Sequence, residues 1–218
     1  MGREYTRIID NSSHPIGEKT LGYWNWDTRL DLNIAGSGTG WGGARDTATV
    51  YRGDGSLRLY TGTAAGDYVI AYERVVLPPS QKVLLDARFR GSVESDVYGI
   101  CIEMASEYAP DALSFAIEYR PYERKWYLRR SNGSEWLYLS DLIAPYALAW
   151  SHVKLAGDFQ TERYLWAVVN KVTLDLSNYK AYKATTSAGA LLAVNLKVST
   201  VGGVSASAYF DEVYLREI

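Results

Sequence analysis

The stretch Lys125-Trp-Tyr-Leu-Arg-Arg-Ser-Asn-Gly-Ser-Glu-Trp-Leu-Tyr-Leu139 decides the fold class, because two alternating runs flank Asn132-Gly133. Asn-Gly is the strongest short signal for a tight β-hairpin turn, whose central residues both need positive φ. The register that follows pairs Ser131 with Ser134, Arg130 with Glu135, Arg129 with Trp136, Leu128 with Leu137 and Tyr127 with Tyr138. Since side chains alternate across a strand, Trp126, Leu128, Leu137 and Leu139 share a core face, and Lys125, Tyr127, Arg129, Trp136 and Tyr138 share the other.

The preceding run, Leu113–Arg120, extends this sheet. A four-residue loop over 121–124 places Tyr119 opposite Trp126, Ile117 opposite Leu128, Glu118 opposite Tyr127 and Ala116 opposite Arg129. A three-residue loop would mix the two faces, so we prefer the longer one. If the run over 97–104 joins the sheet with Ile100, Ile102 and Met104 inward, Cys101 and Glu103 lie on the outer face beside Glu118.

Period-two alternation bounded by Gly, Pro, Asn, Asp and Ser recurs along the whole chain, and helical periodicity is almost absent. The predicted strands are 48–52, 56–61, 67–77, 82–90, 96–105, 112–120, 125–131, 134–140, 150–157, 162–169, 171–176, 191–200 and 206–215. Only 141–149 has room for a helical turn, and Pro145 limits it. The pattern predicts an all-β, two-sheet antiparallel sandwich of jelly-roll type. We expect a single domain over 1–218, with 1–47 as a leading strand and a Gly- and Trp-rich loop, and 48–218 as the main sandwich.

The amino-acid composition argues against several classes of binding partner. The net charge is −2 and no basic run occurs, which argues against nucleic acid, because phosphate neutralisation dominates that affinity. No segment approaches a transmembrane helix, and no apolar h-region follows the charged N-terminus, so we expect neither membrane insertion nor a signal peptide in this chain. The 18 Tyr and 7 Trp against 4 Phe favour surfaces that are half wet.

The outer face of the hairpin is the first candidate site. Its predicted members are Tyr127, Arg129, Trp136, Tyr138, Glu118 and Glu103. Flat rings can stack on a sugar while the charged groups hydrogen-bond its hydroxyls. The alternative is purely structural, because cross-strand aromatic pairs and a cation–π contact of Arg129 with Trp136 stabilise a hairpin by themselves.

A second candidate comes from the N-terminal region, where Trp24, Trp26 and Trp41 lie in or beside glycine-rich turns. The glycines permit tight turns, but no phosphate-loop sequence is present. The three tryptophans are a secondary ligand platform or, more simply, core packing at the edge of the sandwich.

Catalytic patterns are weak in this sequence. His14 and His152 are far apart and form no zinc pattern with the single cysteine, Cys101. No nucleophile elbow occurs. A glycosidase needs only two carboxylates, which Glu103 and Glu118 can supply, and this is the least favoured alternative. We therefore expect a protein that is not an enzyme.

Three blocks of the sequence resemble the concanavalin A-like (laminin G-like) jelly rolls: Trp150-Ser-His-Val-Lys-Leu155, Glu162-Arg-Tyr-Leu-Trp-Ala-Val-Val-Asn170 and Tyr209-Phe-Asp-Glu-Val-Tyr-Leu215. The resemblance implies a glycan-binding or adhesive role and, in some members, a structural calcium ion with a closing-strand ligand, for which Asp211 is the matching position. Catalytic members of laminarinase type use Glu-x-Asp-x-x-Glu. The nearest run here, Glu94-Ser-Asp-Val-Tyr-Gly99, lacks the final glutamate.

Together these observations predict a lectin-like protein of adhesion or assembly. The favoured context is an exposed phage virion component, a capsid-decoration or tail protein on the virion surface or extracellular after release. The alternative is a carbohydrate-binding module or lectin of a secreted polysaccharide-degrading protein. In either context the expected binding partners are glycans or other subunits of an assembly. Because one shallow face binds sugars weakly, we expect a homo-oligomer or another multivalent display. Apart from structural Ca²⁺, no cofactor is expected.

Overall fold

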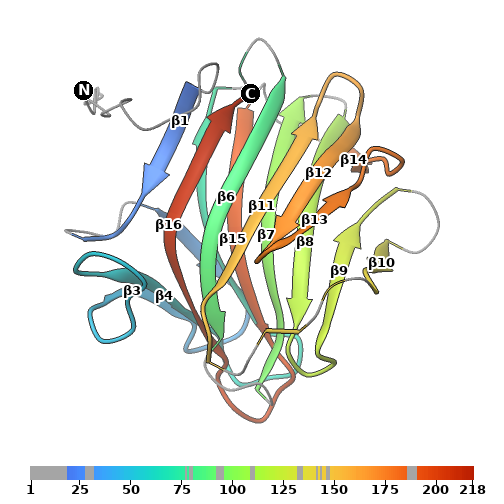
Figure 1. Cartoon of the computed structure of the whole chain (residues 1–218). Coiled ribbons are helices and arrows are strands. Elements are labelled where there is room, and N and C mark those ends of the chain that lie inside the picture. The colour runs from blue at the N-terminus through green and yellow to red at the C-terminus, as the bar shows by residue number, and fades with distance from the viewer. Residues whose placement is uncertain are drawn as a thin grey trace.

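The computed structural model describes residues 19–27, 32–76, 78, 81–91, 96–108, 111–131, 135–140, 142, 144–145, 148–185 and 191–218. It contains two eight-stranded antiparallel sheets stacked face to face, as Figure 1 shows. The predicted all-β sandwich is thereby confirmed. Within these ranges no helix is long and apolar enough to cross a membrane.

The first sheet, sheet A, follows the order β13-β12-β11-β6-β16-β4-β3, and β1 also pairs with β16. Its strands are β1 (Lys19–Trp24), β3 (Gly42–Asp46), β4 (Ser56–Tyr60), β6 (Lys82–Gly91), β11 (Ser151–Asp158), β12 (Arg163–Val169), β13 (Val172–Asp175) and β16 (Ser207–Glu217). The long strand β16 pairs with β4 along its first half and with β1 along its second half.

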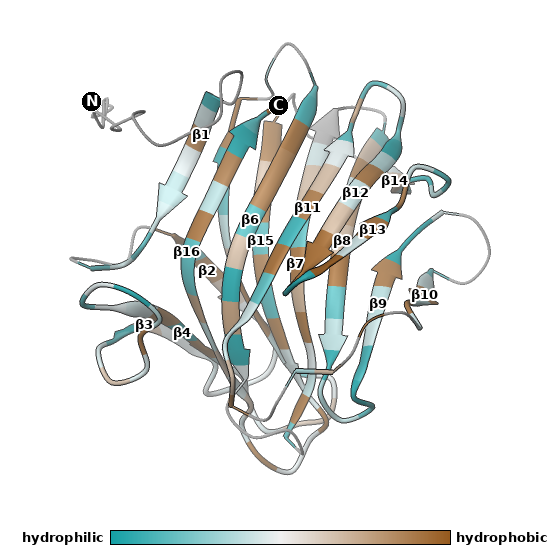
Figure 2. Cartoon of the chain, in the orientation of Figure 1, coloured by the Kyte–Doolittle hydropathy of each residue, from teal (hydrophilic) through white to brown (hydrophobic). Residues whose placement is uncertain are grey.

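The second sheet, sheet B, follows the order β10-β9-β8-β7-β15-β5-β2, and β14 also pairs with β8. Its strands are β2 (Asn33–Gly36), β5 (Tyr68–Val75), β7 (Val97–Tyr108), β8 (Asp111–Arg120), β9 (Lys125–Arg129), β10 (Trp136–Tyr138), β14 (Tyr182–Thr185) and β15 (Leu191–Thr200). Figure 2 shows apolar and polar residues alternating along these strands.

The core lies between the sheets and is built from the inward residues of both. Its large side chains include Phe89, Phe115, Trp126 and Phe210, all at most 2% exposed. The rings of Phe89 and Trp126 meet edge to face across the sandwich, with centroids 5.9 Å apart. Trp126 therefore lies on the core face, as the alternation predicts.

The predicted hairpin registers are confirmed. In β9 and β10, Arg129 pairs with Trp136 and Tyr127 with Tyr138. In β8 and β9, Glu118 pairs with Tyr127, as the four-residue loop requires. Strand β7 joins β8 with Ile100, Ile102 and Met104 buried. The Asn132-Gly133 turn itself and Ser134 lie outside the described residues.

The N-terminal third differs from the prediction. The segment 48–52 is not a strand, because its backbone N–H groups bond to side chains: Asp46 Oδ1 accepts from Ala48 and Thr49, and Asp211 Oδ2 accepts from Tyr51 and Arg52. The described part of 1–47 has three strands where one strand and a loop were expected. Strands β2 and β3 are short and contain glycine, so pairing with β5 and β4 defines them more than their own pattern.

Sheet B splits along β8, and this split positions the candidate site. Strand β8 pairs with β14 up to Ser114 and with β9 from Ile117 onward. Ala116 lies at the split, where Tyr164 reaches across from sheet A. The Tyr164 hydroxyl accepts the Ala116 N–H at 2.9 Å and donates to the Arg129 carbonyl at 2.6 Å. The hydroxyl thus replaces the direct pairing of Ala116 with Arg129 that the sequence predicts.

Candidate functional site

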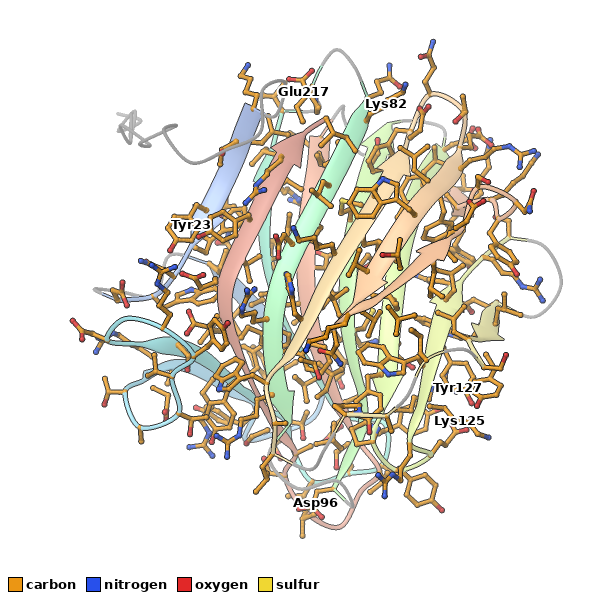
Figure 3. All side chains as sticks on the ribbon, viewed as in Figure 1. Tyr23, Lys82, Asp96, Lys125, Tyr127 and Glu217 are labelled. Atoms are coloured by element: carbon orange, nitrogen blue, oxygen red, sulfur yellow. The ribbon has the colours of Figure 1, made fainter. Side chains whose placement is uncertain are left out.

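The outward side chains of sheet B form one continuous polar and aromatic surface, which we call the sheet B face. Strand pairing brings together Tyr68 and Tyr72 of β5, Asn195 and Lys197 of β15, Glu103 of β7, Glu118 and Arg120 of β8, Tyr127 and Arg129 of β9, Trp136 and Tyr138 of β10, and Tyr182 of β14. All six residues predicted for the primary site are in this set. Figure 3 shows Tyr127 and Lys125 close together at the β9 side of the molecule.

Arg129 organises one half of the sheet B face. Its guanidinium contacts Glu103 at 2.9 Å and Glu135 at 2.8 Å. Glu103 also accepts hydrogen bonds from Ser114 and, at 2.9 Å, from Asn195. The ring of Tyr182 lies over the guanidinium, with 4.0 Å between Cζ and the ring centroid. Arg129 is therefore held in place by two carboxylates and an aromatic ring.

Arg120 organises the other half. It bonds Glu118 at 2.6 Å, and Glu123 lies 3.4 Å away. Its Cζ is 4.1 Å from the ring centroid of Tyr127, 5.2 Å from that of Tyr98 and 5.6 Å from that of Trp136. The guanidinium is therefore interleaved with aromatic rings.

The aromatic rings predicted to bind a ligand also have contacts within the protein. The expected Arg129–Trp136 cation–π contact is present at 5.9 Å. Arg120 also contacts Tyr127 and Trp136, so these rings already have charged neighbours. By contrast, Tyr138 is 47% and Tyr98 40% exposed, and these rings are accessible at the rim. Some of these aromatic rings therefore stabilise the hairpin, and others are exposed enough to contact a ligand.

The sequence did not reveal Lys197 as a site residue. It is half-buried on β15, opposite Ile70 on one side and Cys101 on the other. Its ammonium lies 4.6 Å from the centroid of the Tyr68 ring. Within the described ranges it makes no ion pair, unlike Arg129 and Arg120. Alternation in 191–200 marks Asn195 and Lys197 as sharing a face, but only tertiary pairing brings that face to Glu103.

The electrostatics of the sheet B face follow from this geometry. Burial raises the pKa of the Glu118 carboxyl, and the hydrogen bond and charge of Arg120 offset only part of that effect. Burial and the neighbouring Glu123 carboxylate raise the pKa of the Tyr127 phenol to about 12. Burial likewise raises the pKa of the Cys101 thiol. Cys101 is therefore a small buried side chain under this face, as its alternating run indicates.

The secondary candidate residues lie in different surroundings. Trp24 and Trp26 are core residues, 9% and 3% exposed, and Trp41 packs against the core. This matches the packing interpretation, which explains them without a ligand. Trp26 has a positive φ of 53°, and the Arg45 Nε donates to its carbonyl at 2.7 Å.

The residues around Asp211 do not fit a calcium ion. Asp211 is fully buried, and its carboxylate accepts N–H bonds from Tyr51, Arg52 and Glu212. Across the described ranges no group of three or more His, Cys, Asp or Glu residues could hold a metal. Nearby, the Arg45 guanidinium donates hydrogen bonds to the carbonyl oxygens of Trp26, Asp27 and Asp54. The positive charge beside these carbonyl oxygens therefore comes from an arginine side chain.

Comparison with known proteins supports the fold. No protein-family model matches the chain, and no curated protein matches it. Among solved structures, it is similar to the endo-β-1,4-glucuronan lyase of the fungus Trichoderma reesei, with a TM-score of 0.62 and 11% identity over 92% of this chain and 96% of that one. A carbohydrate esterase from the Shiga toxin-encoding bacteriophage phi24B has a TM-score of 0.56 and 12% identity, covering 92% and 99%. A structure of carbohydrate-binding modules of the β-sandwich superfamily has a TM-score of 0.52 and 10% identity, covering 88% and 59%.

These similarities confirm the resemblance to jelly-roll sandwiches of the concanavalin A-like type. They also overturn the expectation that the protein is not an enzyme, since a lyase and an esterase share its fold. The sequence argument tested only for nucleophiles, zinc ligands and paired carboxylates, so it did not cover other classes of reaction.

Proposed function

We propose that the chain binds an acidic polysaccharide across the sheet B face and cleaves it by β-elimination, with Lys197 binding the uronate carboxylate. The observation that carries this proposal is the half-buried residue Lys197, whose ammonium has no ion-pair partner among the described residues. A cation in this state is available to an incoming carboxylate. The likeness to a glucuronan lyase supports the choice of substrate class.

The chemistry requires three contributions. A cation beside the C6 carboxylate of the sugar makes the C5 proton more acidic, and a base removes that proton. A C4–C5 double bond then forms as the C4–O4 bond breaks, and an acid protonates the O4 oxygen. Lys197 supplies the positive charge. Tyr68, whose ring lies 4.6 Å from the ammonium, is the group that we assign to both proton transfers: its phenolate takes the C5 proton, and the resulting phenol gives that proton to O4.

The remainder of the sheet B face suits the neighbouring sugars. Asn195 and Glu103, which hydrogen-bond each other at 2.9 Å, are next to Lys197 in the strand pattern and can bind hydroxyl groups. Arg129 and Arg120 are held rigidly farther along the same face. Their charges are already paired with carboxylates, but their fixed positions lower the entropic cost of hydrogen bonding to sugar hydroxyls.

The test compares Lys197→Met with Lys125→Met on polyglucuronate and on alginate. Lys125 is a matched control, because its ammonium lies on the same face but already has Glu123 at 3.7 Å. Turnover is measured from the ultraviolet absorbance of the unsaturated product. We expect Lys197→Met to lose about 10²–10³-fold in kcat, as when one transition-state charge partner is removed, and Lys125→Met to change little. Full activity of Lys197→Met, or binding of both polymers by the wild type without product, would refute the proposal.

A phage virion remains our proposed place of action. The likeness to a phage carbohydrate esterase supports it. Multivalent display would raise the affinity of a weak site by orders of magnitude. Mass spectrometry of purified virions and light scattering of the isolated protein test this placement. A monomer at all concentrations, found only outside virions, would contradict it.

A further inference from the structure

The opposite side of the molecule, the outer face of sheet A, carries a second cluster of charged and aromatic side chains. Its central strands are β4, β16, β6 and β11. Their outward cations include Arg58 on β4, Arg88 and Arg90 on β6, and Lys154 on β11, with His152 beside them and Arg216 of β16 on the same face. We call this cluster the sheet A face.

Positive charge dominates where the sheet A face meets solvent. Arg58 is exposed, and Arg88, Arg90 and Lys154 are half-buried. The carboxylates on these strands that share the face are buried instead: Asp86 and Asp158 are each 5%, Asp211 0% and Glu212 8% exposed. Although the chain as a whole has a net charge of −2, this face therefore presents cations to solvent.

The buried carboxylate of Asp86 contacts three basic side chains of this cluster. Its Oδ1 lies 2.6 Å from His152 Nε2 and 4.0 Å from Arg88, and its Oδ2 lies 3.4 Å from Lys154. One shielded negative charge thus holds several positive groups in place. A cluster of this kind is preorganised for an anion.

Aromatic rings alternate with these cations. Tyr209 on β16 lies directly between Arg58 and Arg90 in the strand register. Arg88 Cζ is 4.4 Å from the centroid of the Tyr51 ring, which is 45% exposed. With strands about 4.8 Å apart, such a face offers charges and rings spaced over roughly 5–10 Å.

We infer that the sheet A face is a second binding site, which takes an extended acidic polysaccharide independently of the sheet B face. Cations bind its carboxylate or sulfate groups, and the rings pack on the apolar faces of its sugars. This inference does not rest on the proposed lyase activity. If both faces bind the same polymer, the protein holds two strands or two turns of it, which increases avidity.

A polysaccharide fits this face better than a nucleic acid. Duplex DNA carries one charge per about 1.7 Å and is bound through clustered Lys and Arg. On the sheet A face the cations alternate with aromatic side chains, and part of their charge is offset by Asp86. That density matches a polymer with one charge per sugar.

The experiment measures binding to polyglucuronate, to a neutral cellulose oligosaccharide and to a single-stranded oligothymidylate at low and high salt. It uses Arg88→Gln/Arg90→Gln, made both in the wild type and in Lys197→Met, which separates this face from the sheet B face. The matched control is Lys171→Gln/Lys180→Gln, which removes two exposed charges from the β12–β13 edge region.

We expect Arg88→Gln/Arg90→Gln to weaken polyglucuronate binding roughly fivefold or more at low salt in both backgrounds, with a smaller salt dependence. The Lys171→Gln/Lys180→Gln control should bind as its parent does. Three results would overturn the inference: equal losses in the control, unchanged binding in Arg88→Gln/Arg90→Gln, or tighter binding of oligothymidylate than of polyglucuronate. Loss of turnover without loss of this binding would concern the sheet B face alone.

Discussion

Replacing Tyr164 with Phe tests whether the Tyr164 hydroxyl, which reaches over from sheet A, stabilises the split between β8 and β9 in sheet B. The Tyr164 hydroxyl is fully buried and bonds the Ala116 N–H and the Arg129 carbonyl, two backbone groups that β8 and β9 leave unpaired at the split. The Phe variant keeps the ring and its edge-to-face contact with Phe115, whose centroid is 4.9 Å away. The substitution therefore removes hydrogen bonding and leaves packing in place.

The expected cost follows from those two backbone groups. A buried donor or acceptor left without a partner costs about 1–3 kcal/mol. With partial relaxation of the strands, we expect Tyr164→Phe to lose about 2 kcal/mol of unfolding free energy. For a domain of this size, that corresponds to a fall in Tm of roughly 4–8 °C.

Urea titration followed by tryptophan fluorescence, together with a thermal scan, measures the loss. Tyr122→Phe is the matched control, because Tyr122 is 68% exposed and the same atom is removed from it. If Tyr164→Phe is within about 0.5 kcal/mol of this control, the hydroxyl does not hold the split, and the reasoning is refuted.

Three further substitutions test the electrostatic assignments. Arg45→Met should cost about 2–3 kcal/mol in urea titration, because three carbonyl oxygens lose a charged donor; an unchanged midpoint would contradict this. Burial alone raises the pKa of Asp86, but the hydrogen bond and charge of His152, with Lys154 and Arg216, reverse this and lower it overall. Its stabilisation is therefore complete above the unfolded pKa of about 3.9 and is lost below it, so Asp86→Asn should differ from wild type at pH 7 and converge with it in acid. Glu118 has a raised pKa, so wild-type stability should fall as pH rises from about 4.3 through that raised pKa, and a Glu118→Gln profile of the same slope would refute the assignment.

The sequence by itself determined the local part of this structure. The period-two pattern and the Asn132-Gly133 signal predicted the pairing of Arg129 with Trp136 and of Glu118 with Tyr127, and both pairs are present. The reason is physical: a shift of one residue would move every apolar side chain to the wrong face, so hairpin register is encoded nearby in the chain.

Only the tertiary structure decided which distant strands became neighbours. Lys197 reaches the site because β15 pairs between β5 and β7. Tyr182 does so because β14 takes over the edge of β8 beyond the split. Backbone hydrogen bonds are alike for any two strands, so the sequence of a strand does not name its partner. The same holds for Tyr164, whose hydroxyl acts on the opposite sheet.

The chemistry that we propose for the sheet B face could not be predicted from the sequence either. The patterns that could be sought locally were nucleophile motifs, zinc spacings and carboxylate pairs, and they indicated no enzyme. A half-buried lysine beside a phenol, such as Lys197 beside Tyr68, has no local signature, because its burial and its lack of an ion-pair partner among the described residues both follow from strand pairing. Sequence therefore determined the sandwich and one of its hairpins, and strand pairing within sheet B determined which side chains share the surface that we propose binds a polymer.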